Sequence, residues 1–117
     1  MTDEEKSALE STFGCSVTEH QEPGLPGVPL IQLSEIMLPA GCSPDRVLVV
    51  FARGQMNGYL SRLFFEKPII PGNGLTLQLQ TQALLGRVMY VHSINQIPAT
   101  LPPHQAILAH LRMYERK

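Results

Sequence analysis

The 117-residue sequence contains no tryptophan and only two cysteines, Cys15 and Cys42. Two cysteines are too few for the disulfide framework of many small secreted domains, and neither has the CxxC or Cys/His spacing of a structural zinc site. We therefore expect free thiols and no metal site. The segments "GLPG" and "PGNG" lack the lysine and the strand-to-helix context of a phosphate-binding loop, so we also expect no cofactor.

Neither sign of charge dominates, because nine Lys and Arg residues face ten Asp and Glu residues, for a formal net charge of −1. This balance argues against a basic surface for nucleic acid or anionic lipid. The sequence also lacks any apolar run near the roughly 20 residues that a membrane-spanning helix needs. Its acidic, polar beginning does not resemble a secretory signal. We expect a single cytoplasmic domain over residues 1–117.

Both ends of the sequence carry helix signals. Thr2 and Glu5 have the spacing of a capping box, and Gly14 is a natural C-terminal stop, so we predict a helix over residues 3–13. Near the other end, two consecutive prolines suit the first turn of a helix, where amide donors are not needed. The apolar residues that follow recur at helical spacing: Ile107, Leu111 and Tyr114. They predict a second helix over about residues 103–115.

The middle of the sequence reads as antiparallel strands. "CSVTEHQE" predicts a weak strand, and stronger strands are predicted at residues 30–38, 46–53 and 60–69. The alternation changes phase near Ser34–Glu35, which indicates a bulge, and Asn57-Gly58 is a strong hairpin signal. These strands form an antiparallel meander of three or four strands. "RVLVVFAR" is apolar on both faces and is predicted to lie centrally in the sheet.

The segment after the meander is less regular. "LTLQLQTQ" alternates and predicts a half-buried strand at residues 75–82 with its leucines on one face. "GRVMYVHSI" is compatible with a strand or a short helix. The predicted fold class is therefore α+β: an N-terminal helix, the meander, an irregular segment and a C-terminal helix, with the helices on one face of the sheet.

Three segments carry a resemblance to a known family. "IMLPAGCSPDRVLVVF", "GQMNGYLSRLFFEKP" and "HQAILAHLRMYERK" resemble, in this order, segments of prokaryotic ubiquitin-conjugating-enzyme-like proteins. The resemblance is strongest over residues 28–68, and it implies the UBC-like fold. It also implies a ubiquitin-like modifier and an activating-enzyme-like protein as partners. In bacteria, modification systems of this kind are tied to antiviral defence against phage.

The chain departs from this family at two places. Tyr59 is followed by Leu60 where the family carries proline. The extended segment after the meander, where the superfamily has its catalytic cysteine, contains none. Because a thioester carrier needs a nucleophilic thiolate, the first interpretation is a non-catalytic or atypical family member that binds a partner.

Two other interpretations stay open. In one, the chain is an active carrier that uses Cys42, in the turn after the first meander strand, as its nucleophile. His92 would be its best functional histidine, because this branch of the superfamily tends to carry one nearby, although a histidine among apolar residues also suits a structural role. In the other, the chain is an unrelated small α+β interaction domain.

The candidate partner surface comprises the meander and the loop at residues 69–74. Leu60, Ile69 and Ile70 are its proposed partner-binding residues, since apolar side chains in an exposed loop mark contact surfaces. Cys15, at the exit of the first helix, is predicted to fill the core.

Overall fold

A computed structural model describes residues 1–25, 27–56, 58–72, 74, 79–92 and 97–115. Its first element is helix α1, Asp3–Phe13. The Thr2 hydroxyl accepts a hydrogen bond from the Glu5 amide at 3.1 Å, and the Glu5 carboxylate accepts one from the Thr2 amide at 2.9 Å. Gly14 ends the helix at φ +64°, with its amide donating to the Glu10 carbonyl. Both predicted boundaries are confirmed.

Within the described residues, the strands form one antiparallel sheet of six strands in the order β1-β2-β3-β4-β6-β5. Their bounds are β1 Val17–His20, β2 Leu30–Met37, β3 Arg46–Ala52, β4 Arg62–Phe65, β5 Leu79–Leu84 and β6 Arg87–His92. The predicted α+β class and the meander are confirmed, and so is the bulge, since the β2–β3 register shifts between Leu33 and Ile36. The predicted meander corresponds to β1–β4, but the expectation that the sheet contains only these strands is wrong, because the β5–β6 hairpin adds two strands beside β4.

The β5–β6 hairpin occupies the segment expected to be irregular. Residues 75–78 of the predicted strand and Asn57 of the predicted hairpin turn lie outside the described residues. The segment "GRVMYVHSI", for which the sequence allowed a strand or a short helix, contains strand β6, Arg87–His92. Leu85 and Gly86 form the two-residue turn with φ angles of +52° and +78°, the backbone that a type I′ hairpin turn requires.

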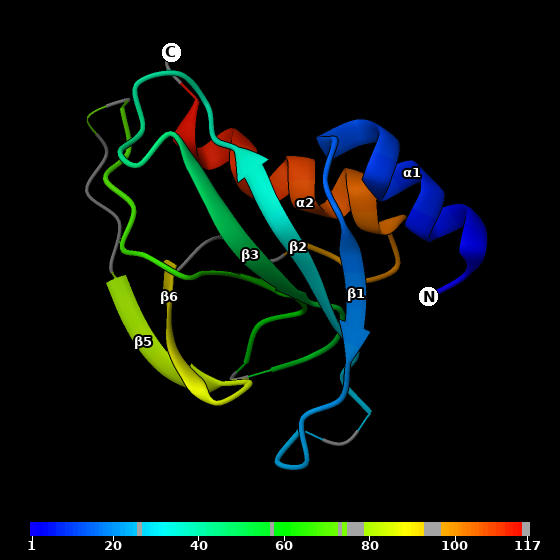
Figure 1. The fold of residues 1–117 in the computed structure, drawn as a ribbon. Helices are drawn as coiled ribbons and strands as arrows, with labels where there is room; N and C mark the ends of the chain where they lie inside the picture. The colour runs from blue at the N-terminus through cyan, green and yellow to red at the C-terminus, as the bar shows by residue number, and fades with distance from the viewer. Residues whose placement is uncertain (26, 57, 73, 75–78, 93–96, 116–117) are drawn as a thin grey trace.

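Helix α2 runs from Pro103 to Leu111 and continues as a 3₁₀ turn, Arg112–Tyr114. The predicted start is confirmed, and the α-helical part ends four residues before the predicted end at 115. Figure 1 shows α1 and α2 along the same face of the sheet, as predicted. None of the described helices is long and apolar enough to cross a membrane.

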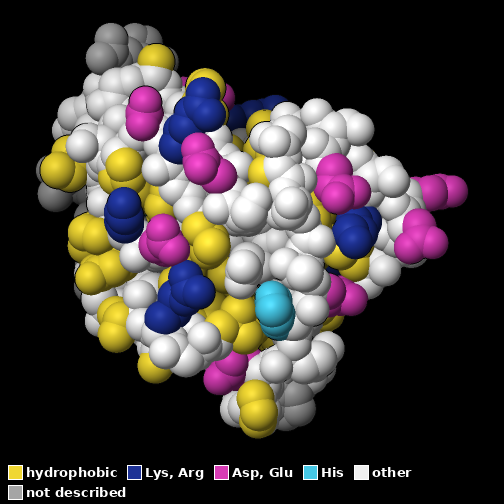
Figure 2. Space-filling view, in the orientation of Figure 1, with side chains coloured by type: hydrophobic (Ala, Val, Ile, Leu, Met, Phe, Trp, Pro, Cys, Tyr) yellow, Lys and Arg dark blue, Asp and Glu magenta, His cyan; other side chains and the backbone are white. Residues whose placement is uncertain are grey.

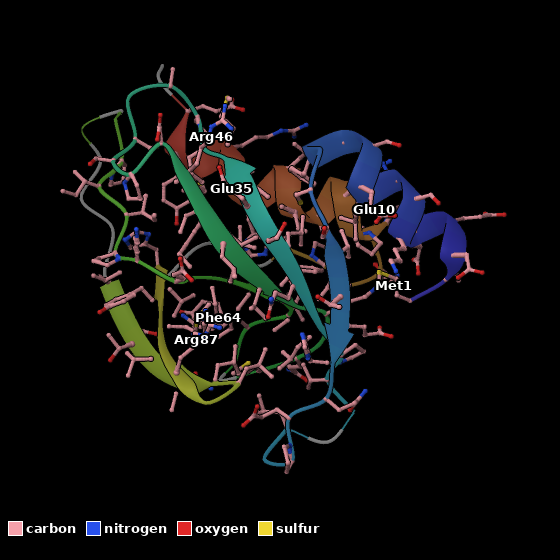
Figure 3. All side chains as sticks on the ribbon, viewed as in Figure 1. Met1, Glu10, Glu35, Arg46, Phe64 and Arg87 are labelled. Carbon is pink, nitrogen blue, oxygen red and sulfur yellow. The ribbon has the colours of Figure 1, made fainter. Side chains whose placement is uncertain are left out.

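The interior has two parts, one on each face of β3. Under the helices, the core contains alternate residues of β2, β3 and β4 with residues of α1, α2 and the 3₁₀ turn; its largest members include Leu9, Phe51, Phe65 and Tyr114. The second core lies where the hairpin curls over the opposite face of the meander, and it includes Leu30, Val50, Phe64, Met89 and Val91. Figure 3 places Phe64 in this space. The prediction that β3 is buried on both faces is confirmed.

Candidate functional site

Cys42 lies in the turn between β2 and β3, with its side chain directed into the core under the helices. Only 7% of the residue is exposed. Its thiol Sγ lies 3.8 Å from the backbone carbonyl oxygen of Tyr114 and donates a weak hydrogen bond to it. A thiol in this position is shielded from bulk solvent, and it faces an acceptor rather than a cation that would stabilise a thiolate.

Tyr114 connects both residues that the sequence singled out as catalytic candidates. Its hydroxyl is 2.7 Å from Nδ1 of His92, and its backbone carbonyl faces Cys42. The Tyr114 ring also packs edge-on against Phe65, with 5.7 Å between ring centroids. Burial lowers the pKa of His92 and raises the pKa of Tyr114. Both groups are therefore held neutral near pH 7, as suits a structural hydrogen bond in a core.

The segment after β4 covers the Cys42 turn. Ser43 and Ile70 exchange backbone hydrogen bonds of 3.0 and 2.9 Å. A Cβ atom on Gly72 would collide with the backbone of Gly41, so the two chain segments lie in direct contact. Consequently Ile69 points inward and is buried in the core, whereas Ile70 is 69% exposed. The two isoleucines assigned to a partner surface thus have different environments.

A buried serine–histidine pair lies between β4 and α2. The Ser61 hydroxyl is 2.6 Å from the carbonyl oxygen of Ile97, to which it donates, and 3.0 Å from Nε2 of His110. Since the serine proton is directed at the carbonyl, the serine oxygen accepts from the protonated Nε2. Nδ1 of His110 has no hydrogen-bond partner among the described residues. This arrangement, with a proton on Nε2 directed at the serine oxygen, suits a structural contact between β4 and α2.

Electrostatics keep this pair neutral. Burial and, to a smaller extent, the positive charge of Arg62 together lower the pKa of His110 to about 4. Arg62 is itself buried, with its guanidinium 4.1 Å from the centre of the Tyr59 ring and 2.9 Å from the Gln80 side-chain oxygen. Desolvation lowers the pKa of Arg62 too.

Two surface depressions flank the exposed side chain of Met37, at the end of β2. The first is apolar and lies between the β2–β3 turn and the end of α2; its lining includes Leu38, Pro39, Ala40, Leu108 and Leu111. The second, of about 460 Å³, lies at the α1–β1 junction and includes Cys15, which is only partly buried. Glu35 and Arg46 border it, with 3.6 Å between their charged groups, and Figure 3 shows them on neighbouring strands.

The remaining candidate, Leu60, lies before β4 and is 40% exposed. Ile70 follows β4 and pairs with Ser43 beyond the opposite end of β3, so Leu60 and Ile70 lie toward different ends of the sheet. Within the described ranges, no three His, Cys, Asp or Glu residues are grouped closely enough to hold a metal ion.

Comparison of the chain with protein-family models, with curated proteins and with solved structures finds no match.

Sequence reasoning missed the residues that organise this region. Tyr114 entered only as an apolar position of the last helix, and Ser61 and Arg62 were not singled out. His110 lay within the predicted second helix without an assigned role. The apolar spacing of the last helix was the available signal, because it placed His110 and Tyr114 on the side that faces the sheet. The residues that His110 and Tyr114 contact lie 22 to 72 positions away in the sequence, and such distant contacts leave no local pattern.

Proposed function

We propose that this chain is a non-catalytic ubiquitin-conjugating-enzyme-like subunit that binds a partner in a bacterial ubiquitin-like modification pathway. Two features support this assignment. The order of elements (helix, antiparallel meander, covering segment and C-terminal helix) is the order that the sequence resemblance implies, except that the β5–β6 hairpin stands in the segment expected to be irregular. The quoted motifs also fall on corresponding elements, since "IMLPAGCSPDRVLVVF" spans the end of β2, the turn and β3.

The environment of Cys42 is the observation that supports a non-catalytic role. A conjugating enzyme must present a thiolate to a bulky modifier and later to an amine. The Cys42 thiol is instead enclosed beneath Ile69 and the 3₁₀ turn, and it donates toward the Tyr114 carbonyl oxygen. The segment after the meander, residues 66–99, contains no cysteine that could replace it. A subunit without a reactive thiolate would contribute to the pathway by binding a partner.

The proposed partner surface is the end of the molecule around the β2–β3 turn, which we call the turn-end surface. It consists of Met37, Leu108 and Ile70, which are 64%, 40% and 69% exposed. Met37 and Leu108 line the same apolar depression, and Ile70 is attached to the turn through Ser43. Apolar side chains concentrated at one end form a contact area for a modifier or an activating enzyme. Ile69 supports this surface from the core.

The first experiment asks whether the chain forms a thioester. The protein is incubated with the candidate modifier, the activating enzyme and ATP, and its intact mass is recorded with and without reductant. We expect no reductant-sensitive gain of one modifier mass while the activating enzyme charges itself. A gain that is lost in Cys42→Ser and kept in Cys15→Ser would contradict the proposal and establish the alternative function, an active carrier with Cys42 as nucleophile.

The second experiment measures binding to the modifier and to the activating enzyme by calorimetry. We expect Ile70→Asp to weaken binding by at least about tenfold, because a charge would be buried at an apolar contact. Leu60→Asp is the matched control: the sequence assigned this partly exposed leucine to the partner surface, but it lies toward the other end of the sheet and outside the turn-end surface. If neither protein bound the wild-type chain, the proposal would fail and the third interpretation, an unrelated interaction domain, would remain.

A further inference from the structure

Strand β5 lies at one edge of the sheet, and among the described residues no strand pairs with its outer side. The two-residue turn at Leu85–Gly86 determines which backbone groups face outward. Residues next to such a turn form a hydrogen-bonded pair, and this pairing then alternates along the hairpin. The backbone amides and carbonyls of Leu84, Gln82 and Gln80, which pair with Arg87, Met89 and Val91, therefore point toward β6. The amides and carbonyls of Leu79, Thr81 and Ala83 face the open edge.

The two edges of the sheet differ in how they are protected. At the other edge, β1 has only four residues, and one of them, Glu19, forms an ion pair of 3.0 Å with the N-terminal amine. Short length and charge are the usual means of keeping an edge strand from pairing with another chain. No charged residue occurs between Lys67 and Arg87, so β5 carries none. The open edge of β5 thus lacks that protection.

One side of the β5–β6 hairpin is also apolar and exposed. Leu79 is 43% and Val88 57% exposed, and Thr81 and Ala83 are exposed beside them. Cross-strand register places Ala83 opposite Val88, and Thr81 opposite Tyr90, on this side. Tyr90 in turn pairs with Phe65, whose side chain lies in the core under the helices. This side therefore continues the helix-covered face of the sheet beyond the helices. Figure 2 shows hydrophobic side chains gathered along the edge where β5 lies in Figure 1.

We propose that β5 pairs in antiparallel orientation with β5 of a second copy of this chain, around a two-fold axis at Thr81. In this register Thr81 faces Thr81 of the second copy, and Leu79 faces Ala83 of the second copy. The strand is self-complementary in this arrangement. The outward amides and carbonyls of one copy lie opposite the outward carbonyls and amides of the other, and no like charges meet. Threonine pairs at facing positions are favourable cross-strand contacts.

The absence of charge also favours this occupant over a charged peptide. A strand that recognised a charged peptide would carry complementary charges along its edge, whereas an uncharged strand is compatible with its own copy. One strand pair buries less surface than a standard stable interface, so we expect a weak dimer with a dissociation constant in the micromolar range or above. This proposal is independent of the proposed function.

The test is sedimentation equilibrium of the full chain over a wide concentration range, with two variants of opposite charge. Thr81→Glu and Thr81→Lys each place like charges opposite one another across the two-fold axis, so each alone should weaken association by about tenfold or more. An equimolar mixture of the two variants should restore a dimer, because each pair then contains one acid and one base. Thr18→Glu, an exposed threonine on β1, is the matched control and should leave association unchanged.

Each result decides the question. A concentration-dependent wild-type dimer that is lost in both charged variants and restored in their mixture would support β5 pairing. A chain that is monomeric at every concentration would overturn the proposal and leave the edge open to a strand of a different protein. A dimer that both Thr81 variants retain would overturn it as well, by showing that another surface associates. The mixture also guards against misfolding, since two misfolded variants would not restore a dimer.

Discussion

Acidification should destabilise this fold through His110, a buried residue of α2 that contacts Ser61 next to β4. The side chain is neutral in the folded protein because burial and the charge of Arg62 lower its pKa to about 4. In the unfolded chain its pKa returns to about 6.5. Between these values the unfolded state binds the proton more readily, so the free energy of unfolding falls as the pH decreases.

The size of the effect follows from the two pKa values. A difference of roughly 2.5 units corresponds to about 3 kcal/mol of unfolding free energy, present above pH 6.5 and lost progressively as the pH falls toward 4. Burial lowers the pKa of His92 as well, so its contribution has the same sign. The hydrogen bond from Arg53 lowers the pKa of Glu5 to about 2, and that stability is lost only below its ordinary value near 4.3. Between pH 6.5 and 4.5, the change in unfolding free energy therefore reports on the buried His110 and His92 and not on Glu5.

The assay is urea-induced unfolding at several pH values from 7 to 4.5, for the wild type and for His110→Gln. The glutamine amide can still donate to Ser61 but does not titrate, so the variant should lose distinctly less stability on acidification. Ser61→Ala is the control: it should lower stability at pH 7 by about 1–3 kcal/mol and keep the acid-induced loss, because burial is the main cause of the lowered pKa. An identical pH dependence in the wild type and His110→Gln would refute this reasoning.

Two further predictions concern Cys42 and Tyr114. Gly72→Ala places a methyl group against the Gly41 backbone, so it should displace the covering segment and accelerate thiol labelling of Cys42 roughly tenfold in a Cys15→Ser background. Gly24→Ala is the control, because its added methyl group meets open space. Equal rates of Cys42 labelling in the two variants would contradict the close contact between Gly72 and Gly41. Tyr114→Phe removes the hydroxyl that pairs with His92 while keeping the ring, and it should cost about 1–3 kcal/mol of unfolding free energy in urea titrations. Unchanged stability would show that this bond contributes little.

Local sequence signals predicted the elements whose causes are local. Thr2, Glu5 and Gly14 satisfy the orphan backbone groups at the ends of α1 within a few residues, so the helix could be placed from its sequence. The same holds for the start of α2 at its two prolines and for the bulge in β2, where the hydrophobic alternation itself changes phase. The double-sided apolar pattern of "RVLVVFA" similarly marked β3 as a central strand.

The alternation of leucines in the later segment did not determine which face is buried. Leu79 belongs to the leucine side of the predicted strand, yet it is exposed, because the helical layer reaches only β6, where Tyr114 contacts His92, and Leu79 lies beyond it on the edge strand β5. Whether the apolar side of a strand is buried depends on whether another part of the chain packs over it, and the sequence of the strand does not contain that information.

Capping, turn and alternation signals act over a few residues, so they were enough to predict the α+β class, the meander and the ends of the first helix. Tertiary packing set the environment of the candidate site residues. It enclosed Cys42 beneath a segment nearly 30 residues away, placed Tyr114 between Cys42 and His92, and joined Ser61 to His110. Burial, the pKa of a histidine and the accessibility of a thiol depend on these long-range contacts, which no local pattern encodes.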